Sequence, residues 1–504
     1  KILVKVFIGL IASVIIISKP DVLFRQILHT GIKVTDSKDT PYGNITRGSY
    51  KGEESMFYNQ RLLSYKNDVI QREEDIHYAM LQSEYPEKVI LISGSLNSNI
   101  PELLKYHVKK IIYIERDPAL AKSEISAKDS VPVELVIENA DAFRYIRNTK
   151  EMADVIILLL PPPSTLLLNK YYTTEFFLEV KKRLNSNGIF LCSPGPGDDY
   201  FNKESLNLYS SIFNSLATVF RNVKPVVGNK LYFIAADKEI KLSFCNLAEM
   251  RGIKNIYVSS DFLSDDLIAN KSDEITSRMD HGIKQNRFAF PVASFHFQSY
   301  NFSKNIDEKI PAIILMLVVF ALPILIIKRR NMVMCLSASA LAGFEIIMLL
   351  TLQLIIGNMF QLTGLIIAGL MAGLAIGAGV NITFLNSFSL RKKVLFLMLF
   401  YIGIGLIYNN LLEVRAVLTA VSIILFLVFL PALYTGHIFR ELTLRTEGMM
   451  TTSATYSADL AGSAFGFILI SGFTVPAFGI QISIFLLSGL VLTGFLFGAV
   501  KNKL

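Results

Sequence analysis

The sequence predicts an α/β domain built on a doubly wound parallel sheet, followed by an all-α transmembrane bundle. Three observations lead to this fold class. The chain has 504 residues, which is too long for one ordinary domain. Long apolar runs fill residues 310–500, whereas residues 20–305 have the composition of a globular domain. Within that globular part, short apolar strands alternate with helical segments, as in a parallel sheet with helices on both faces.

Four segments follow along the chain. Residues 1–18 contain an apolar run that is too short for a complete span, and we interpret them as the end of a transmembrane helix whose upstream region is missing. Residues 20–70 are interpreted as a linker and a small β-hairpin subdomain, because residues 42–70 alternate polar and apolar side chains between glycines. Residues 71–305 form the α/β domain, and residues 310–504 form a bundle of about seven helices.

The strands of the α/β domain are predicted where short apolar runs end in turn or polar residues. They are residues 88–93, 109–115, 133–138, 154–160, 188–193 and 230–236. Helical segments follow the first and third of these strands, at residues 99–107 and 141–147. This alternation is the basis for expecting parallel strands joined by helical crossovers.

The bundle is predicted from apolar segments that are long enough to cross a bilayer. They are residues 310–327, 332–356, 361–382, 394–409, 413–434, 456–475 and 479–500. Basic residues gather at alternate ends of these segments, at 328–330, 391–393, 437–445 and 501–503. By the positive-inside rule these ends and Lys1 face the cytoplasm, and the α/β domain is extracytoplasmic. We expect the membrane to be a bacterial inner membrane and the domain to be periplasmic.

The charge and the cysteines favour neither a nucleic acid partner nor a metal site. The net charge of +8 comes largely from basic residues at the ends of apolar runs, so we expect no nucleic acid partner. Cys192, Cys245 and Cys335 lack the spacing of metal ligands, so we expect no metal site. The partners that we expect are the lipid bilayer and other membrane proteins.

Small residues recur at helical spacing inside the bundle. Gly369, Gly373 and Gly377 lie four residues apart, and Gly462 and Gly466 repeat the spacing. Such stripes let transmembrane helices approach closely. They are predicted to serve helix packing, and the sequence does not separate packing within the chain from packing between subunits.

Two carboxylates lie inside the predicted spans. Glu345 falls within the second span, and Asp459 near the start of the sixth. Acidic residues within a membrane are candidates for function, so a transporter that works through the bundle is an alternative hypothesis. No basic residue accompanies the two acids within these spans.

An acid follows the second strand of the α/β domain. Glu115 stands where nucleoside-binding sheets place the carboxylate that binds ribose hydroxyls, and the loop after the first strand contains Gly94. Only one glycine of a glycine-rich turn is present, so Glu115 and Asp117 also fit an interpretation as simple polar residues at a strand end.

The strand at residues 154–160 has an unusual end. It runs into "LLPPP", which consists of Leu159, Leu160, Pro161, Pro162 and Pro163. Ligands bind beyond the carboxyl ends of parallel strands, where an active site needs polar groups. None of these five side chains can transfer a proton.

The segments "PYGNI", "EKVILISGSLNSNIPELLKY", "YIERDPAL", "NADAFRYIR" and "DVIILLLPPPSTLLLNKYYTTEFF" resemble the spermidine synthase (polyamine aminopropyltransferase) family. The stretch "TYSADLAGSAFGFILISGFTVPAFG" resembles the penultimate span of its membrane-fused branch. The resemblance implies a Rossmann-like fold of the class I methyltransferase type. It also implies transfer of an aminopropyl group from decarboxylated S-adenosylmethionine to a diamine.

The resemblance assigns roles to individual residues. Leu159 and Pro162 stand at the positions of the two aspartates that follow this strand in the family. Ala79 replaces the carboxylate of the family's Tyr-His-Glu motif. The positions at which the family has catalytic acids therefore carry no acid here. We expect the chain to have no catalytic residues.

The nucleoside half of the site is better retained. Tyr42, Gly94, Glu115 and Asp141 match positions of the family's nucleoside pocket. We therefore expect a pseudoenzyme whose domain serves as a binding or scaffold module in a membrane complex, with no cofactor beyond a residual S-adenosylmethionine-type nucleoside. An active aminopropyltransferase is an alternative, with Glu73, Glu74 and Asp75 replacing the lost acids.

Overall fold

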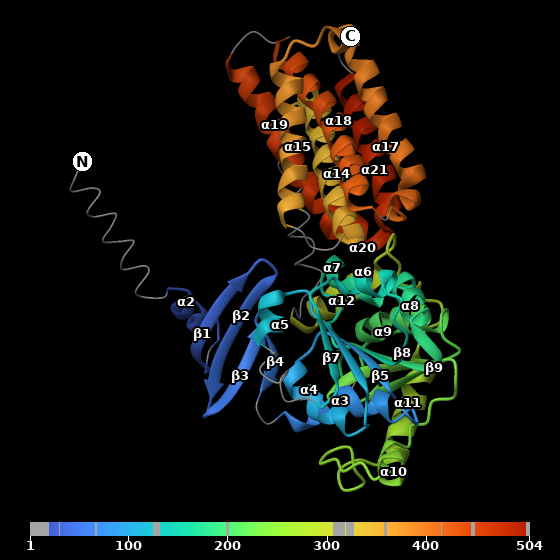
Figure 1. Ribbon diagram of the computed structural model, residues 1–504. Helices are drawn as coiled ribbons and strands as arrows, with labels where there is room; N and C mark the ends of the chain where they lie inside the picture. The colour runs from blue at the N-terminus through green and yellow to red at the C-terminus, as the bar shows by residue number, and fades with distance from the viewer. Residues whose placement is uncertain are drawn as a thin grey trace, which may run out of the picture. The chain divides into compact units, whose positions relative to one another are not determined.

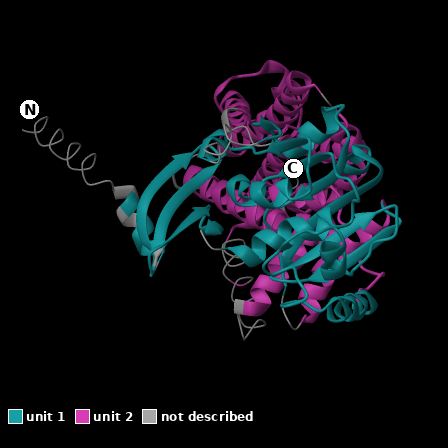
Figure 2. Cartoon of the chain, turned by 60° about the horizontal axis from the view of Figure 1, so that its bottom comes forward, with its two compact units in different colours: residues 1–161, 179–200, 220–278 teal, residues 162–178, 201–219, 279–504 magenta. Residues whose placement is uncertain are grey.

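The computed structural model describes most of the chain. The described residues are 20–29, 31–65, 68–123, 132–197, 201–305, 318, 327–356, 360–414, 416–444 and 449–499. The predicted N-terminal membrane segment lies outside them, and the predicted span at 310–327 lies almost wholly outside them. The chain divides into two compact units (Figure 2). Unit 1 comprises residues 1–161, 179–200 and 220–278, and unit 2 comprises residues 162–178, 201–219 and 279–504.

Unit 1 begins with a small sheet that follows helix α2 (Pro20–Leu28). Its strands are β1 (Lys33–Thr40), β2 (Gly43–Tyr50), β3 (Glu53–Tyr58) and β4 (Arg61–Tyr65), paired antiparallel in chain order. Two-residue turns with positive φ join β2 to β3 and β3 to β4, and Asn59 tolerates that conformation in the second. The sheet is larger than the predicted hairpin and starts earlier. Strand β1 escapes prediction because Val34 is its one fully buried residue, which leaves no apolar alternation.

The second sheet of unit 1 has seven strands in the order β10-β11-β9-β8-β5-β6-β7 (Figure 1). They are β5 (Lys88–Ile92), β6 (Lys110–Ile114), β7 (Glu134–Glu138), β8 (Ala153–Leu158), β9 (Leu184–Pro196), β10 (Asn222–Val227) and β11 (Lys230–Ala236). Strands β5 to β9 pair in parallel, and β11 is antiparallel to both of its neighbours. The prediction of a wholly parallel sheet is therefore wrong at β11. Only Gly228 and Asn229 separate β11 from β10, and so short a connection can join only antiparallel strands. The predicted Rossmann-like fold of the methyltransferase type is confirmed.

The helices of unit 1 are α3 (Val69–Met80), α4 (Leu96–Leu104), α5 (Pro118–Ser123), α6 (Ala142–Asn148), α10 (Phe244–Met250) and α11 (Asp265–Arg278). Polar side chains cap three of them at the N-terminus: Asp68 caps α3, Ser95 caps α4 and Asp141 caps α6. Buried apolar residues of α3 and α4 pack with those of β5, β6, β8, β9 and β11 in one core.

Unit 2 combines a group of short helices with the bundle. The short helices are α7 (Leu166–Asn169), η2 (Lys170–Tyr172), the start of α8 (Thr174–Lys181), α9 (Lys203–Ala217) and α12 (Val292–Asn305). Asn286 is fully buried among them. Its side chain donates to the Tyr172 carbonyl at 2.9 Å and accepts from the Ala293 N–H at 3.1 Å. Its backbone N–H donates to Ser215 at 2.8 Å, so one amide ties the segments together.

Among the residues that the structure describes, the bundle contains six helices long and apolar enough to cross a membrane (Figure 1). They are α14 (Met332–Ile356), α15 (Phe360–Gly379), α17 (Leu390–Leu412), α18 (Val417–Leu444), α21 (Ile480–Ala499) and the continuous helix formed by α19 (Met449–Ile468), the π-turn η4 (Leu469–Thr474) and α20 (Val475–Phe478). The short helix α16 (Thr383–Asn386) precedes α17. These six helices correspond to the last six of the seven predicted spans, and α14 is the most deeply buried of them.

The glycine stripes serve contacts inside the bundle. A Cβ at Gly373 would approach the Phe429 carbonyl of α18 to 2.7 Å. A Cβ at Gly462 or Gly466 of α19 would overlap the carbonyl of Cys335 or Ser339 in α14. The close approach also lets Ser339 Oγ donate to the Gly462 carbonyl at 2.7 Å. The question left open by the sequence is therefore answered in favour of packing within the chain.

Candidate functional site

The residues predicted from the sequence lie along one edge of the seven-stranded sheet. Ile92 of β5 pairs with Ile114 of β6 on one side and with Leu158 of β8 on the other. Ile114 in turn pairs with Glu138 of β7. Because these four strands are parallel, the segments that follow them meet at their common carboxyl edge. Gly94, Glu115, Asp141 and Leu159 each lie within three residues of such a strand end.

Glu115 is the buried acid of this edge, with 5 % of its surface exposed. Ser93 Oγ donates to its Oε2 at 2.9 Å, and the Asp117 N–H donates to its Oε1 at 3.0 Å. Burial raises the pKa of the Glu115 carboxyl, although these two hydrogen bonds act in the opposite direction. Each carboxylate oxygen has further lone-pair capacity, so Glu115 can still accept from the hydroxyls of a ligand.

Asp117 connects this edge with the four-stranded sheet. Its Oδ2 accepts from Thr40 Oγ1 at 2.6 Å and from the Tyr58 hydroxyl at 3.1 Å, while its Oδ1 accepts from the Ala119 N–H at 2.9 Å. Burial and the nearby Asp117 raise the pKa of the Tyr58 phenol. Sequence reasoning missed Thr40 and Tyr58, because nothing local marks their pairing with a residue 59 or more positions away.

The two remaining nucleoside-pocket candidates lie beside these acids. Tyr42 occupies the β1–β2 turn, and the Arg116 guanidinium lies 5.3 Å from its ring centre. This cation–π contact places Tyr42 next to the end of β6. Asp141 follows β7 and accepts from the Arg144 N–H at 3.2 Å as the cap of α6. One of its oxygens therefore has a structural role.

The loop after β5 is occupied by an apolar side chain. Ser93 and Gly94 both have positive φ, 60° and 80°, so Gly94 supplies a conformation that glycine adopts easily. A Cβ at Gly94 would meet Leu159 Cδ1 at 2.7 Å. Leu159 also packs against the core that contains Leu91 and Leu96. The residue at the expected position of an acid thus fills the space next to the glycine turn.

The segment after Leu159 supplies no replacement acid. Leu160, Pro161 and Pro162 are half-buried and Pro163 is buried. The Pro162 carbonyl accepts from the Ser164 N–H at 2.6 Å. None of the four side chains carries a titratable group, so this strand end cannot act as a general base.

The three acids of α3 are held by partners elsewhere in unit 1. Glu73 accepts from the backbone N–H groups of Ile256, Tyr257 and Val258 at 2.8, 2.8 and 2.9 Å. Asp75 accepts from Lys230 Nζ at 2.8 Å and from the Tyr232 hydroxyl at 2.7 Å. These contacts join α3 to the β10–β11 hairpin and to residues 256–258. They do not involve the loops after β5 and β8.

Glu74 is the third acid and is fully buried. Its Oε2 accepts from the Asn229 N–H at 2.8 Å. Burial raises its pKa to about 7, although that hydrogen bond acts in the opposite direction. Ala79, one turn further along α3, is also fully buried and brings no carboxylate.

The two acids of the bundle lie at different depths. Asp459 is one helical turn before Gly462, which packs on Cys335 at the start of α14. Glu345 is ten residues beyond Cys335 on α14, and the two helices run in the same direction, since Ser339 packs on Gly466. At 1.5 Å per residue the acids are separated by roughly 20 Å along the bundle. They do not form one ion-binding site.

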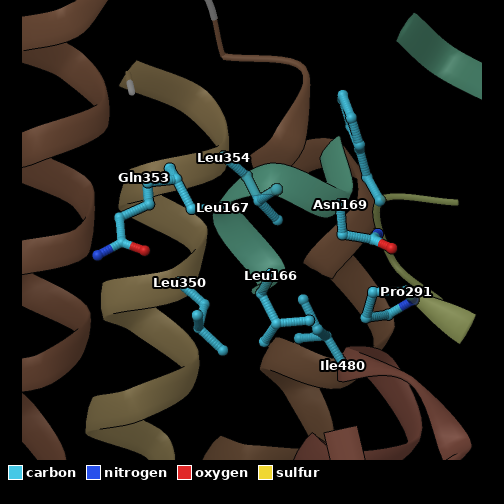
Figure 3. A pocket seen from close by; sticks show the side chains of 9 residues that line it. Leu166, Leu167, Asn169, Pro291, Leu350, Gln353, Leu354 and Ile480 are labelled. Carbon is cyan, nitrogen blue, oxygen red and sulfur yellow. The ribbon is translucent and has the colours of Figure 1, made fainter. Parts of the chain in front are cut away.

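Unit 2 also contains a small apolar pocket at one end of the bundle (Figure 3). Its walls come from the last two turns of α14, the first residue of α21, α7 and the segment before α12. Leu166, Phe288, Leu350 and Ile480 are among its lining residues. The Ile480 N–H donates to the Ala289 carbonyl at 2.8 Å, which fixes this end of the bundle against the segment.

A known family model matches the part of the chain that contains most of the seven-stranded sheet. Residues 69–231 match the spermine/spermidine synthase domain. The chain is similar to the polyamine aminopropyltransferase of Oceanobacillus iheyensis, with 29% identity over 208 residues, covering 38% of each protein. It is also similar to that of Sulfurisphaera tokodaii, with 27% identity over 206 residues, covering 39% of this chain and 66% of the relative. The chain thus spans less than two thirds of the length of each.

Two solved structures of spermidine synthases are similar to part of the chain. Spermidine synthase in complex with the transition state analogue AdoDATO matches 49% of this chain and 87% of its own, with a TM-score of 0.39 and 17% identity. Spermidine synthase from Thermotoga maritima matches 50% of this chain and 87% of its own, with a TM-score of 0.39 and 18% identity.

Proposed function

Because the chain contains a spermidine synthase-like domain, we propose that it uses this domain as a catalytically inactive binding module, held outside the cytosol by its bundle. The observation that carries the proposal is Leu159 packed on Gly94 at the carboxyl end of β8. An amine that attacks a carbon must lose a proton, and a cationic amine needs carboxylates to hold it. This strand end offers neither.

What remains of the site favours binding of a nucleoside. Glu115 retains acceptor capacity, and Tyr42 and Asp141 lie at the adjoining strand ends. We propose an S-adenosylmethionine-type nucleoside as the residual ligand, and another membrane protein as the partner that the domain engages. In this scheme the ligand occupies the domain without being turned over.

We expect no aminopropyl transfer by the purified full-length chain in detergent. With decarboxylated S-adenosylmethionine and putrescine, product should form at least about a hundredfold more slowly than with an active aminopropyltransferase assayed in parallel, the factor typical of a lost general base. The readout is spermidine measured by mass spectrometry. Turnover close to that of the control enzyme would disprove the proposal.

An active aminopropyltransferase is the second candidate, favoured by the names of the relatives. It requires an acid in place of Leu159. Glu73, Glu74 and Asp75 are the acids that sequence reasoning offered, but each is held by other groups of unit 1. The same turnover assay decides between the two functions.

Two features support the extracytoplasmic placement. Basic residues precede α14, begin α17 and end α18, which marks one end of the bundle. The segment at 286–291 and α7 pack at the opposite end, where α14 finishes and α21 starts. By the positive-inside rule the basic end is cytoplasmic, so the helices of the α/β fold that belong to unit 2 lie on the far side.

A membrane-impermeant maleimide tests this placement in intact cells. Tyr85→Cys places a thiol at a residue of the α/β domain with 86% exposure, and Leu444→Cys places one at the basic end of α18 with 73% exposure. We expect Tyr85→Cys to react in intact cells and Leu444→Cys only after permeabilisation. The native cysteines are buried, so their background should be low. The reverse pattern would place the domain in the cytosol.

A further inference from the structure

Exposed apolar side chains gather on residues 249–267, which run from the end of α10 to the start of α11. In the described part of unit 1, four of the six most exposed large apolar side chains belong to this segment. They are Met250, Ile256, Phe262 and Leu267, with exposed fractions of 76, 62, 66 and 64%. Single exposed apolar residues are normal, whereas a group of them marks a site of interaction. Residues 249–267 are called the α10–α11 surface below.

The α10–α11 surface is attached firmly to the core of unit 1. Phe244, Val258 and Ile268 are buried in the same core cluster as the central strands. The Glu73 carboxylate accepts from the N–H groups of Ile256 and Val258 at 2.8 and 2.9 Å. The backbone of Ile256 is therefore held on its inner side while its side chain remains exposed.

Hydrogen bonds also connect the two parts of the surface. Ser260 Oγ donates to the Glu249 carboxylate at 2.7 Å, which joins the loop to the end of α10. The Phe262 N–H donates to the Ser259 carbonyl at 3.1 Å, and the Phe262 ring lies 6.3 Å from that of Tyr257. Figure 1 shows α10 and the loop that follows it at the periphery of the unit. The apolar side chains thus stand on one ordered surface.

An exposed acid accompanies three of the four apolar side chains. Met250, Phe262 and Leu267 are directly preceded by Glu249, Asp261 and Asp266, and all three acids are exposed. Neither Asp261 nor Asp266 pairs with a basic residue in the part of the chain that the structure describes. Their charges are therefore available to a partner.

Positive charge on the α10–α11 surface is smaller. The segment contains four acids and two bases, Arg251 and Lys254. Arg251 Nη1 donates to the Ser83 carbonyl at 2.6 Å, so its guanidinium is directed toward the residues after α3. Lys254 is exposed. A surface with this excess of negative charge is repelled by anionic lipids and attracts the Lys or Arg side chains of a protein.

The backbone of the surface limits how a partner can bind. Residues 249–267 are all described and contain no strand. The N–H groups of residues 256–258 already donate to Glu73, so they cannot pair with an added strand. Recognition must then use side chains, as when an amphipathic helix binds through its apolar face. Lys or Arg residues beside that face would meet the exposed acids.

We propose that the α10–α11 surface is where the domain engages its partner protein, and that the partner contributes an amphipathic helix whose apolar face is flanked by Lys or Arg. The inference rests on the proposed function, in which the domain is a binding module. It goes beyond that function by naming the surface and the chemistry of the partner.

Photo-crosslinking of the full chain, in the cells that naturally produce it, tests the inference. The probe is p-benzoylphenylalanine in place of Phe262, and the control has it in place of Tyr85, an exposed aromatic residue elsewhere in unit 1. Mass spectrometry identifies the crosslinked peptide. We expect Phe262 to yield an adduct with a segment of another protein that combines apolar residues with Lys or Arg. Tyr85 should not yield this adduct.

A charge reversal separates specific binding from apolar adhesion. Asp261→Lys combined with Asp266→Lys should reduce the adduct by about tenfold or more, because like charges that face each other across an interface repel. Asp36→Lys combined with Glu54→Lys is the matched control, since it changes the net charge equally on exposed residues of the four-stranded sheet. The adduct should be unchanged in this control.

Thermal unfolding checks that both double variants are folded. If the charge reversal unfolds the domain, Asp261→Asn combined with Asp266→Asn takes its place, and the adduct should again fall. The four Lys substitutions are at exposed positions, so unfolding temperatures close to that of the wild type are expected.

Five results would overturn the inference. They are an adduct with a second copy of this chain, an adduct with lipid, an adduct with a segment that lacks basic residues, an equal loss of adduct in both double variants, and no adduct beyond that of Tyr85. Each would leave the proposed inactivity standing, because the turnover assay measures it separately. Turnover by the purified chain would disprove the proposed function whatever the crosslinks show.

Discussion

Glu73→Ala is expected to lower the stability of the α/β domain by about 2–4 kcal/mol, a loss larger than that of most single substitutions. The carboxylate accepts three backbone N–H groups from residues 256–258, of which only that of Val258 is fully buried. A buried donor left without an acceptor costs about 1–3 kcal/mol, and the two part-buried donors cost less because water can reach them. Because the chain contains no tryptophan, differential scanning calorimetry is a suitable way to follow the unfolding transition.

Glu249→Ala is the matched control for Glu73→Ala. Glu249 is an exposed acid that accepts from Ser260 Oγ at 2.7 Å in the same part of unit 1. Its replacement should change stability by less than about 0.5 kcal/mol, as is usual at the surface. If Glu73→Ala unfolded at the wild-type temperature but lost ligand binding, Glu73 would belong to the ligand site and the structural assignment would be wrong.

Gly462→Ala is expected to destabilise the bundle by about 2–4 kcal/mol. The added Cβ would overlap the Cys335 carbonyl, so α14 and α19 must move apart. Overpacking of this kind costs about 1–3 kcal/mol. The hydrogen bond from Ser339 to the Gly462 carbonyl would be lost as well, for about a further 1 kcal/mol. Calorimetry and size-exclusion chromatography in detergent measure the outcome.

Gly489→Ala in α21 provides the comparison for this substitution. Nothing lies within 4 Å of a Cβ at Gly489, so the methyl group enters open space. Alanine is the better helix former by up to about 1 kcal/mol, and the variant should be as stable as the wild type or slightly more stable. Equal transition temperatures for Gly462→Ala and Gly489→Ala would contradict the close packing of α14 on α19.

Much of the fold could be predicted because its signals are local. Strands such as β5 and β8 are continuous apolar runs, and each of the six described spans is an apolar segment long enough to be recognised by itself. Glu115 and Leu159 could be placed at one edge because both directly follow strands that the pattern made parallel. The antiparallel direction of β11 was not predicted. It follows from the two-residue turn after β10, which is too short for the helical crossover that joins parallel strands.

The partners of the α3 acids could not be predicted in the same way. The sequence suggests that the acidic run Glu73, Glu74 and Asp75 lies on an exposed helix face, although these acids come after the first turn of α3. The groups that bury them lie 155 to 185 residues further along the chain. Local periodicity carries no information about such distant contacts, so the sequence could not show that these three acids bind groups elsewhere in unit 1.

The make-up of unit 2 has a practical consequence for anyone who wishes to produce the α/β domain alone. A fragment that stops at residue 305 would end just after α12 and discard the bundle. Leu166, Phe288 and Ala289 pack against the buried core of the bundle, and the Ala289 carbonyl accepts from Ile480. Such a fragment would expose these apolar side chains and an unpaired backbone carbonyl to water, and we expect it to aggregate. To obtain a soluble fragment, these three residues would first have to be replaced by polar ones.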